Sequence, residues 1–122
     1  MSCDNNTNVD FRPAQYNIQI WKSDTWSQVM RLYANTEPID LTGSIVEIQV
    51  RTRPNATSAV MTLTEADGIT IGGEFFNQIT INYPVTINAG SYVYDLAVEF
   101  PNGNIKTYVW GNFIVYQDIT QL

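Results

Sequence analysis

The stretch that decides the fold runs from Gly90 to Gly103 and reads GSYVYDLAVEFPNG. Every second side chain in it is large and apolar: Tyr92, Tyr94, Leu96, Val98 and Phe100. Successive side chains of a strand point to opposite faces, so this period of two predicts a strand with one buried face. Asn102-Gly103 then predicts a type I′ hairpin turn, because both residues accept a positive φ.

The same alternation extends outward from this stretch in both directions. Further runs lie at 16–21, 26–32, 44–51, 77–83 and 104–116. Turn residues separate the runs at intervals of roughly 8–12 residues, which is typical of a sandwich or barrel. No segment has helical periodicity. We therefore expect an all-β, antiparallel domain of about eight strands over residues 15–122, preceded by a polar N-terminal arm over 1–14. A change of face near Gly111 predicts a bulge in the last strand.

Charge excludes some partners. The net charge is -6, and the six basic residues are scattered along the chain. Nucleic acids and anionic membranes both require a basic surface, so neither is an expected partner. Only 15% of residues are charged, which leaves a surface of uncharged polar side chains that is weakly protected against association.

The first residues carry no targeting signal that we can identify. Met1 to Asn6 contain no basic region and no apolar run, so we expect no signal peptide and synthesis in the host cytoplasm. Cys3 is the single cysteine and cannot form an internal disulfide.

The residues that usually perform catalysis are poorly represented. The chain has no histidine, which removes the commonest general base and metal ligand. Asp95 and Glu99 share a strand face, but four residues of strand place them roughly 13 Å apart, too far for a carboxylate-pair hydrolase. We therefore expect no enzymatic activity and no catalytic residue.

No cofactor or metal site is expected. The glycines at Gly68 and Gly72-Gly73 lack the lysine and the helix of a phosphate-binding loop. Glu65 and Asp67 lie close together, but two carboxylates at a turn are ordinary turn chemistry.

The aromatic residues offer two interpretations. Trp21 and Trp110 fall opposite the best apolar stripes of their own strands, so both should point outward. Outward tryptophans favour protein–protein contact, where they often contribute most of the binding energy. Flat aromatic rings also stack on sugars, so a carbohydrate-binding surface is the second interpretation. Phe11 and Arg12 of the arm join Trp21 and Trp110 as expected contact residues.

Several ordered segments resemble small structural domains of tailed-bacteriophage virions. The order and spacing are similar to the N-terminal domain of phage baseplate upper proteins over roughly Tyr16 to Thr120. The segments that carry the resemblance are 24–26 (DTW), 38–43 (PIDLTG), 46–51 (VEIQVR), 67–71 (DGITI), 90–96 (GSYVYDL) and 111–115 (GNFIV). The resemblance implies an immunoglobulin-like β-sandwich that assembles with copies of itself or with larger virion proteins.

The resemblance also implies a place in the virion. Baseplate upper proteins continue into a receptor-binding extension, whereas this chain stops at Leu122. We therefore expect a non-enzymatic capsid decoration, or cement, protein that forms a homo-oligomer and binds neighbouring virion proteins, either the major capsid protein or tail and baseplate proteins. A tail, neck or baseplate adaptor is the alternative within this class, and a carbohydrate-binding adhesion module is the alternative from another class.

Overall fold

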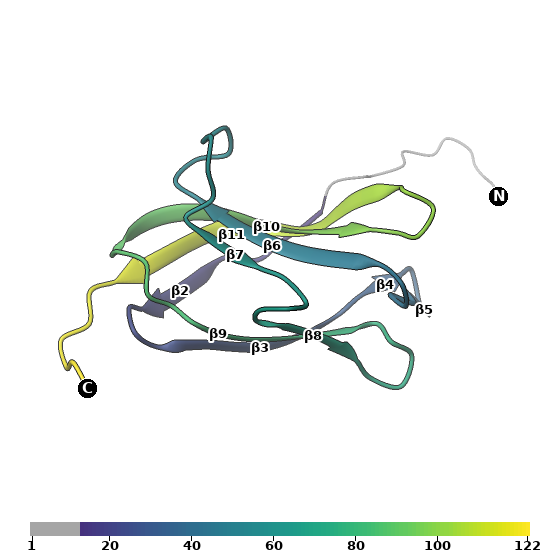
Figure 1. The fold of residues 1–122 in the computed structure, drawn as a ribbon, viewed down its shortest axis with the longest axis horizontal. Helices are drawn as coiled ribbons and strands as arrows, with labels where there is room; N and C mark the ends of the chain where they lie inside the picture. The colour runs from purple at the N-terminus through teal and green to yellow at the C-terminus, as the bar shows by residue number, and fades with distance from the viewer. Residues whose placement is uncertain (1–12) are drawn as a thin grey trace.

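The alternating segments form eleven strands in the computed structural model, which describes residues 13–122 (Figure 1). No helix within this range is long and apolar enough to cross a membrane. The strands are β1 (Ala14–Gln15), β2 (Ile18–Trp21), β3 (Thr25–Arg31), β4 (Tyr33–Ala34), β5 (Glu37–Pro38), β6 (Ile45–Arg51), β7 (Met61–Leu63), β8 (Ile69–Gly72), β9 (Gln78–Pro84), β10 (Gly90–Glu99) and β11 (Ile105–Tyr116).

The strands form two facing sheets and one small ribbon. The large sheet has the order β1-β11-β10-β6-β7, with β2 also paired to β11; the small sheet is β3-β9-β8, and β4 pairs with β5. Figure 1 shows the large sheet above the small one. This division of strands is that of immunoglobulin sandwiches. The predicted immunoglobulin-like sandwich is confirmed.

β1 and β2 are two parts of one interrupted strand at the edge of the large sheet. Ala14 pairs with Val109, and Ile18 pairs with Phe113, so β1 and β2 keep one register against β11 and run parallel to it. Counting them as one strand and setting the β4–β5 ribbon aside gives eight main strands, as the sequence predicts.

The core lies between the sheets and comes from the alternating apolar residues. Leu96 and Val98 of the predicted stripe are fully buried. On the neighbouring strand β6, the buried residues beside this stripe are Val46, Ile48 and Val50. Each such side chain contributes about 1.5–3 kcal/mol through removal from water. The period of two therefore identified the buried face correctly in both strands.

An aromatic cluster occupies the centre of the sandwich. Trp26 of β3 meets Tyr94 of β10 at 5.9 Å between ring centroids and Phe113 of β11 at 5.1 Å. In antibody domains a disulfide joins the two strands that correspond to β3 and β10. Cys3, the single cysteine, lies outside the described residues. Packed rings therefore link the two sheets at this position.

The interruption between β1 and β2 depends on Gly111. A Cβ at this position would overlap the carbonyl oxygen of Tyr16. Tyr94 Oη donates a hydrogen bond to the same carbonyl, and the Asn112 amide donates to Asn17 Oδ1 at 3.0 Å. Glycine is thus needed where the first edge strand bends onto β11.

The predicted bulge in the last strand exists but lies elsewhere. Leu96 pairs with Val109 while Ala97 pairs with Thr107, so the extra residue is Tyr108, not a residue near Gly111. The bulge turns Ile105 outward, where it is 70% exposed. In a regular strand Ile105 and Val109 would share a face, but the bulge leaves Val109 buried and Ile105 exposed.

The hairpin between β10 and β11 forms where Asn102-Gly103 predicted it, but with another turn type. Gly103 has φ +89°, whereas Asn102 does not have a positive φ. The Phe100 amide donates to the Asn104 carbonyl at 2.8 Å, and the Gly103 amide donates to the Phe100 carbonyl at 2.8 Å. Pro101 fixes a negative φ at the first central position, which excludes a type I′ turn.

Candidate functional site

Aromatic side chains gather on the outer face of the large sheet. Trp21 and Tyr116 are cross-strand partners whose ring centroids lie 5.6 Å apart, and they are 46% and 41% exposed. Ile114 and Trp110 follow on the same face of β11, because residues two apart share a face. We call Trp21, Trp110, Ile114 and Tyr116 the outer stripe.

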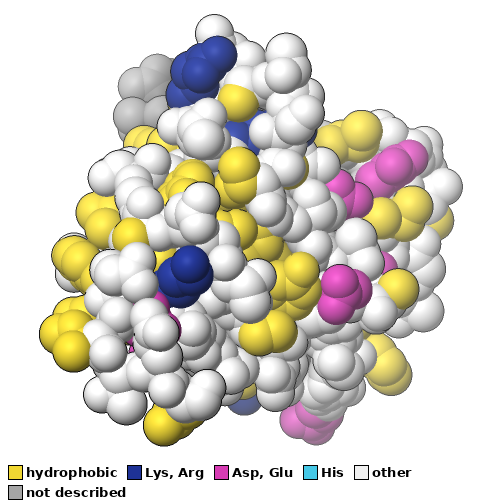
Figure 2. Space-filling model, turned by 60° about the vertical axis from the view of Figure 1, so that its left-hand side comes forward, with side chains coloured by type: hydrophobic (Ala, Val, Ile, Leu, Met, Phe, Trp, Pro, Cys, Tyr) yellow, Lys and Arg dark blue, Asp and Glu magenta, His cyan; other side chains and the backbone are white. Residues whose placement is uncertain are grey.

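Figure 2 turns the left-hand end of Figure 1, where β2 and β11 end, toward the reader. Hydrophobic side chains lie over much of this view, mixed with uncharged polar ones, and the carboxylates lie mainly toward the right. The end of the sandwich seen in this view therefore carries little charge, and a surface of this kind favours association over solvation.

The four residues expected to make contacts fall into two groups. Trp21 and Trp110 point outward as the alternation predicts, from β2 and β11 respectively, and the latter is 40% exposed. Phe11 and Arg12 lie outside the described residues. The role of all four in binding a partner stays a prediction.

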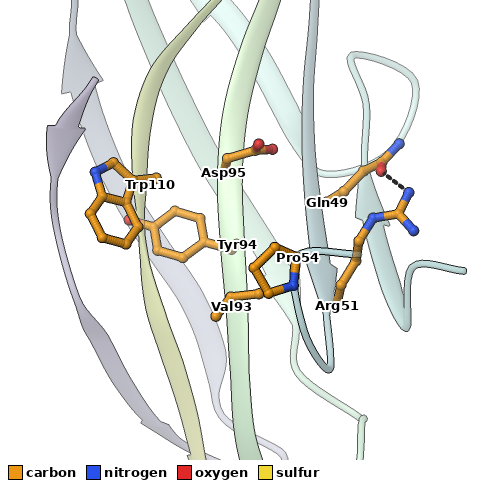
Figure 3. Close-up of a pocket in the computed structure, with 7 residues that line it drawn as sticks. All are labelled: Gln49, Arg51, Pro54, Val93, Tyr94, Asp95 and Trp110. Carbon is orange, nitrogen blue, oxygen red and sulfur yellow. Dashed lines mark hydrogen bonds between the residues drawn. The ribbon is translucent and has the colours of Figure 1, made fainter. Parts of the chain in front are cut away.

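A pocket of about 230 Å³ adjoins the outer stripe at Trp110. Its wall includes Trp110 of β11 and Val93 of β10, and Pro54 from the loop between β6 and β7 closes another side (Figure 3). Asp95 of β10 and Gln49 of β6 supply polar groups. Trp110, Asp95 and Gln49 are aligned across three neighbouring strands, so the sheet itself fixes their spacing.

Arg51 braces the loop that forms the pocket wall. Its Nη2 donates to Gln49 Oε1 at 2.6 Å, as Figure 3 shows, and its Nη1 donates to the Ala56 carbonyl at 2.7 Å. The bond to Ala56 holds the loop to β6. Partial burial raises the pKa of the Asp95 carboxyl, and the nearby charge of Arg51 opposes that rise.

Asp95 and Glu99 both lie on the outer face of β10, as predicted, with Ala97 between them. Across residues 13–122, no three carboxylate or cysteine side chains come together as a set able to hold a metal ion. The Asp40 carboxylate accepts hydrogen bonds from the hydroxyl of Thr42 at 2.6 Å and from its amide at 2.9 Å, which lower its pKa. This carboxylate caps the turn between Asp40 and Thr42.

Sequence reasoning missed part of this surface. Tyr116 was not singled out, although its place six residues after Trp110 on the same strand face was a usable signal. The pocket walls were also missed, because Pro54 reaches Val93 through the folding of the loop rather than through a local pattern.

Comparisons with known proteins add the following. No protein-family model matches the chain, and no curated protein matches it significantly. Among solved structures with a similar backbone is CopC from Methylosinus trichosporium OB3b, with a TM-score of 0.49 and 14% sequence identity, covering 87% of this chain and 89% of CopC.

Proposed function

We propose that this chain is a non-enzymatic structural protein of a tailed-phage virion, and that it binds neighbouring virion proteins through the outer stripe. The observation that carries the proposal is the exposure of Trp21, Trp110 and Tyr116 on one face of a rigid sheet. A folded domain of this size does not need three outward aromatic rings for its own core. Tryptophan and tyrosine are enriched among the residues that dominate protein–protein binding.

The virion setting is supported by the resemblance of the ordered segments to domains of phage baseplate upper proteins. Within the virion, capsid decoration is the role we propose, with a tail, neck or baseplate adaptor as the alternative. Many copies on a regular lattice would strengthen weak contacts through effective concentration. A low surface charge suits such packing.

The test is binding to intact tailed-phage particles, measured by cosedimentation and located by immunogold labelling. The informative variant is the double substitution Trp21→Ala and Tyr116→Ala, with Tyr33→Ala as the control, because Tyr33 is also exposed but lies on the β4–β5 ribbon. We expect the double variant to bind at least tenfold more weakly, since exposed aromatic anchors at an interface often cost 2 kcal/mol or more, roughly, when truncated. The control should bind normally.

Two outcomes would contradict the proposal. If the wild-type chain fails to bind particles, the virion role is wrong. If the double variant binds as well as wild type, the outer stripe is not the contact surface. Gold particles on heads would support decoration, and gold particles on tails would support the adaptor.

One observation favours a second candidate, carbohydrate binding. The pocket beside Trp110 combines an aromatic ring, a carboxylate and an amide, and sugars are bound by such groups. A shift of the Trp110 indole N–H signal in an NMR titration with neutral oligosaccharides would support this candidate.

A further inference from the structure

The pocket at β6, β10 and β11 contains an acceptor without a partner. In the described part of the chain, no hydrogen bond or ion pair reaches the Asp95 carboxylate. The charge of Arg51 acts on Asp95, but the Arg51 guanidinium is bonded to Gln49 Oε1 and to the Ala56 carbonyl. The exposed carboxylate is therefore open to solvent and accessible to a group of another molecule.

The other polar groups of the pocket are already engaged. Gln49 accepts from Arg51 through Oε1 and donates to Glu47 through Nε2. The amide thus has little left to offer a neutral ligand. A sugar, which needs several donors and acceptors at once, would find one carboxylate and a ring. A cation needs only the carboxylate and the ring.

The apolar walls suit a long cationic side chain. Trp110, Val93 and Pro54 line the pocket around Asp95. Lysine and arginine bury their methylene stems against such surfaces while the charged group reaches a carboxylate, and tryptophan is the best aromatic partner for a cation. The net charge of -6 adds long-range attraction for a basic partner surface.

We propose that this pocket receives an arginine or lysine side chain of the partner protein, with its charge at Asp95 and its stem against Trp110. The inference rests on the proposed function in that the partner is taken to be a protein. Arg51 also lines the pocket and its charge acts on Asp95, but its guanidinium is bonded to Gln49 Oε1 and to the Ala56 carbonyl. Arg51 and the loop that carries Pro54 therefore act as positioning groups for the wall.

The experiment is a titration of the isotope-labelled full chain followed by NMR. The probes are neutral oligosaccharides, N-acetyl-arginine methylamide, the corresponding lysine derivative, and N-acetyl-citrulline methylamide, which keeps the shape of arginine without its charge. The reporters are the indole N–H of Trp110 and the backbone amides of Val93 and Asp95. We expect saturable shifts with the cationic probes and a response at least tenfold weaker with citrulline.

Two variants make the result specific. Asp95→Asn preserves shape and should weaken binding of the cationic probes roughly tenfold or more. Glu99→Gln is the matched control, because Glu99 lies on the same outer face of β10 but does not line the pocket. Binding to the control should equal that of the wild-type chain.

Several outcomes would overturn the inference: equal shifts with citrulline, no response to either cation, or an unchanged response in Asp95→Asn. Shifts of the Trp110 signal with neutral oligosaccharides but not with the cations would assign the pocket to sugar instead. This titration uses no phage particles, so its failure is distinct from failure of the proposed function, which the cosedimentation assay decides.

Discussion

Two aromatic groups lie within a few residues of each other on β11 and have opposite environments. Phe113 packs with Trp26 and Tyr94 in the interior, whereas Trp110 and Tyr116 lie on the outer face. Residue type does not separate the two groups; parity along the strand does. The inner cluster joins the two sheets, and the outer stripe is available to a partner. Aromatic content alone therefore says little about function, and the face on which each ring lies says much more.

The sharpest way to break this comparison is to remove one tryptophan from each group. We expect Trp26→Ala to reduce the free energy of unfolding by about 3–5 kcal/mol, because it leaves a large cavity in the core. We expect Trp21→Ala to change it by less than about 1 kcal/mol, since the ring is half exposed. Urea denaturation measures both. Similar losses in the two variants would mean that the outer stripe holds the fold rather than serving a partner.

A second substitution tests the contact between the inner cluster and the edge strand, which is the hydrogen bond from Tyr94 to the Tyr16 carbonyl. Gly111→Ala would push a methyl group against the Tyr16 carbonyl, which accepts the hydrogen bond from Tyr94. We expect a loss of about 1–3 kcal/mol, because backbone yields less readily than side chains. Gly72→Ala is the control, since a Cβ there would meet no atom within 4 Å. Thermal unfolding that is equally affected in both variants would show that the bend between β1 and β2 does not require glycine.

The smallest expected effect concerns the carboxylate beside the outer stripe. The pKa of Asp95 is raised in the folded state, so the folded chain binds this proton more tightly than the unfolded chain. Its contribution to stability is therefore greatest at low pH and is lost as pH rises through the Asp95 pKa. Asp95→Asn should be slightly more stable than wild type at neutral pH, by up to about 0.5 kcal/mol for an exposed group.

The measurement is the difference in unfolding free energy between wild type and Asp95→Asn from pH 3 to pH 7. Asp40, whose pKa is lowered, has the opposite pH dependence, but it is present in both proteins and cancels from the difference. A variant that is clearly less stable at neutral pH would mean that Asp95 has a structural partner rather than an open acceptor.

The sequence predicted the inner region better than the outer one. Alternation placed Tyr94, Leu96 and Val98 in the core and turned Trp21 and Trp110 outward, because the period of two is a property of the strand itself. Alternation misplaced the bulge, which lies at Tyr108 and not near Gly111, because no local residue marks the position where the phase shifts.

Local sequence patterns could not predict the pocket beside Trp110. Its wall depends on Arg51 holding the Ala56 carbonyl, a contact made within a loop whose course the alternation does not describe. The turn type of the hairpin was, in contrast, predictable in retrospect. Pro101 stands directly before Asn102, and its fixed negative φ suits the first central position of the observed turn from Phe100 to Gly103.

The parallel pairing of β1 and β2 with β11 has a mechanical consequence. The described chain starts at Pro13 near one end of the sandwich and finishes at Leu122 near the other (Figure 1). Tension between these ends would pull β2 and β11 past each other along their length. Their ladder would then be loaded in shear, with its hydrogen bonds resisting together instead of opening one by one. A domain with this geometry resists stretching along its long axis.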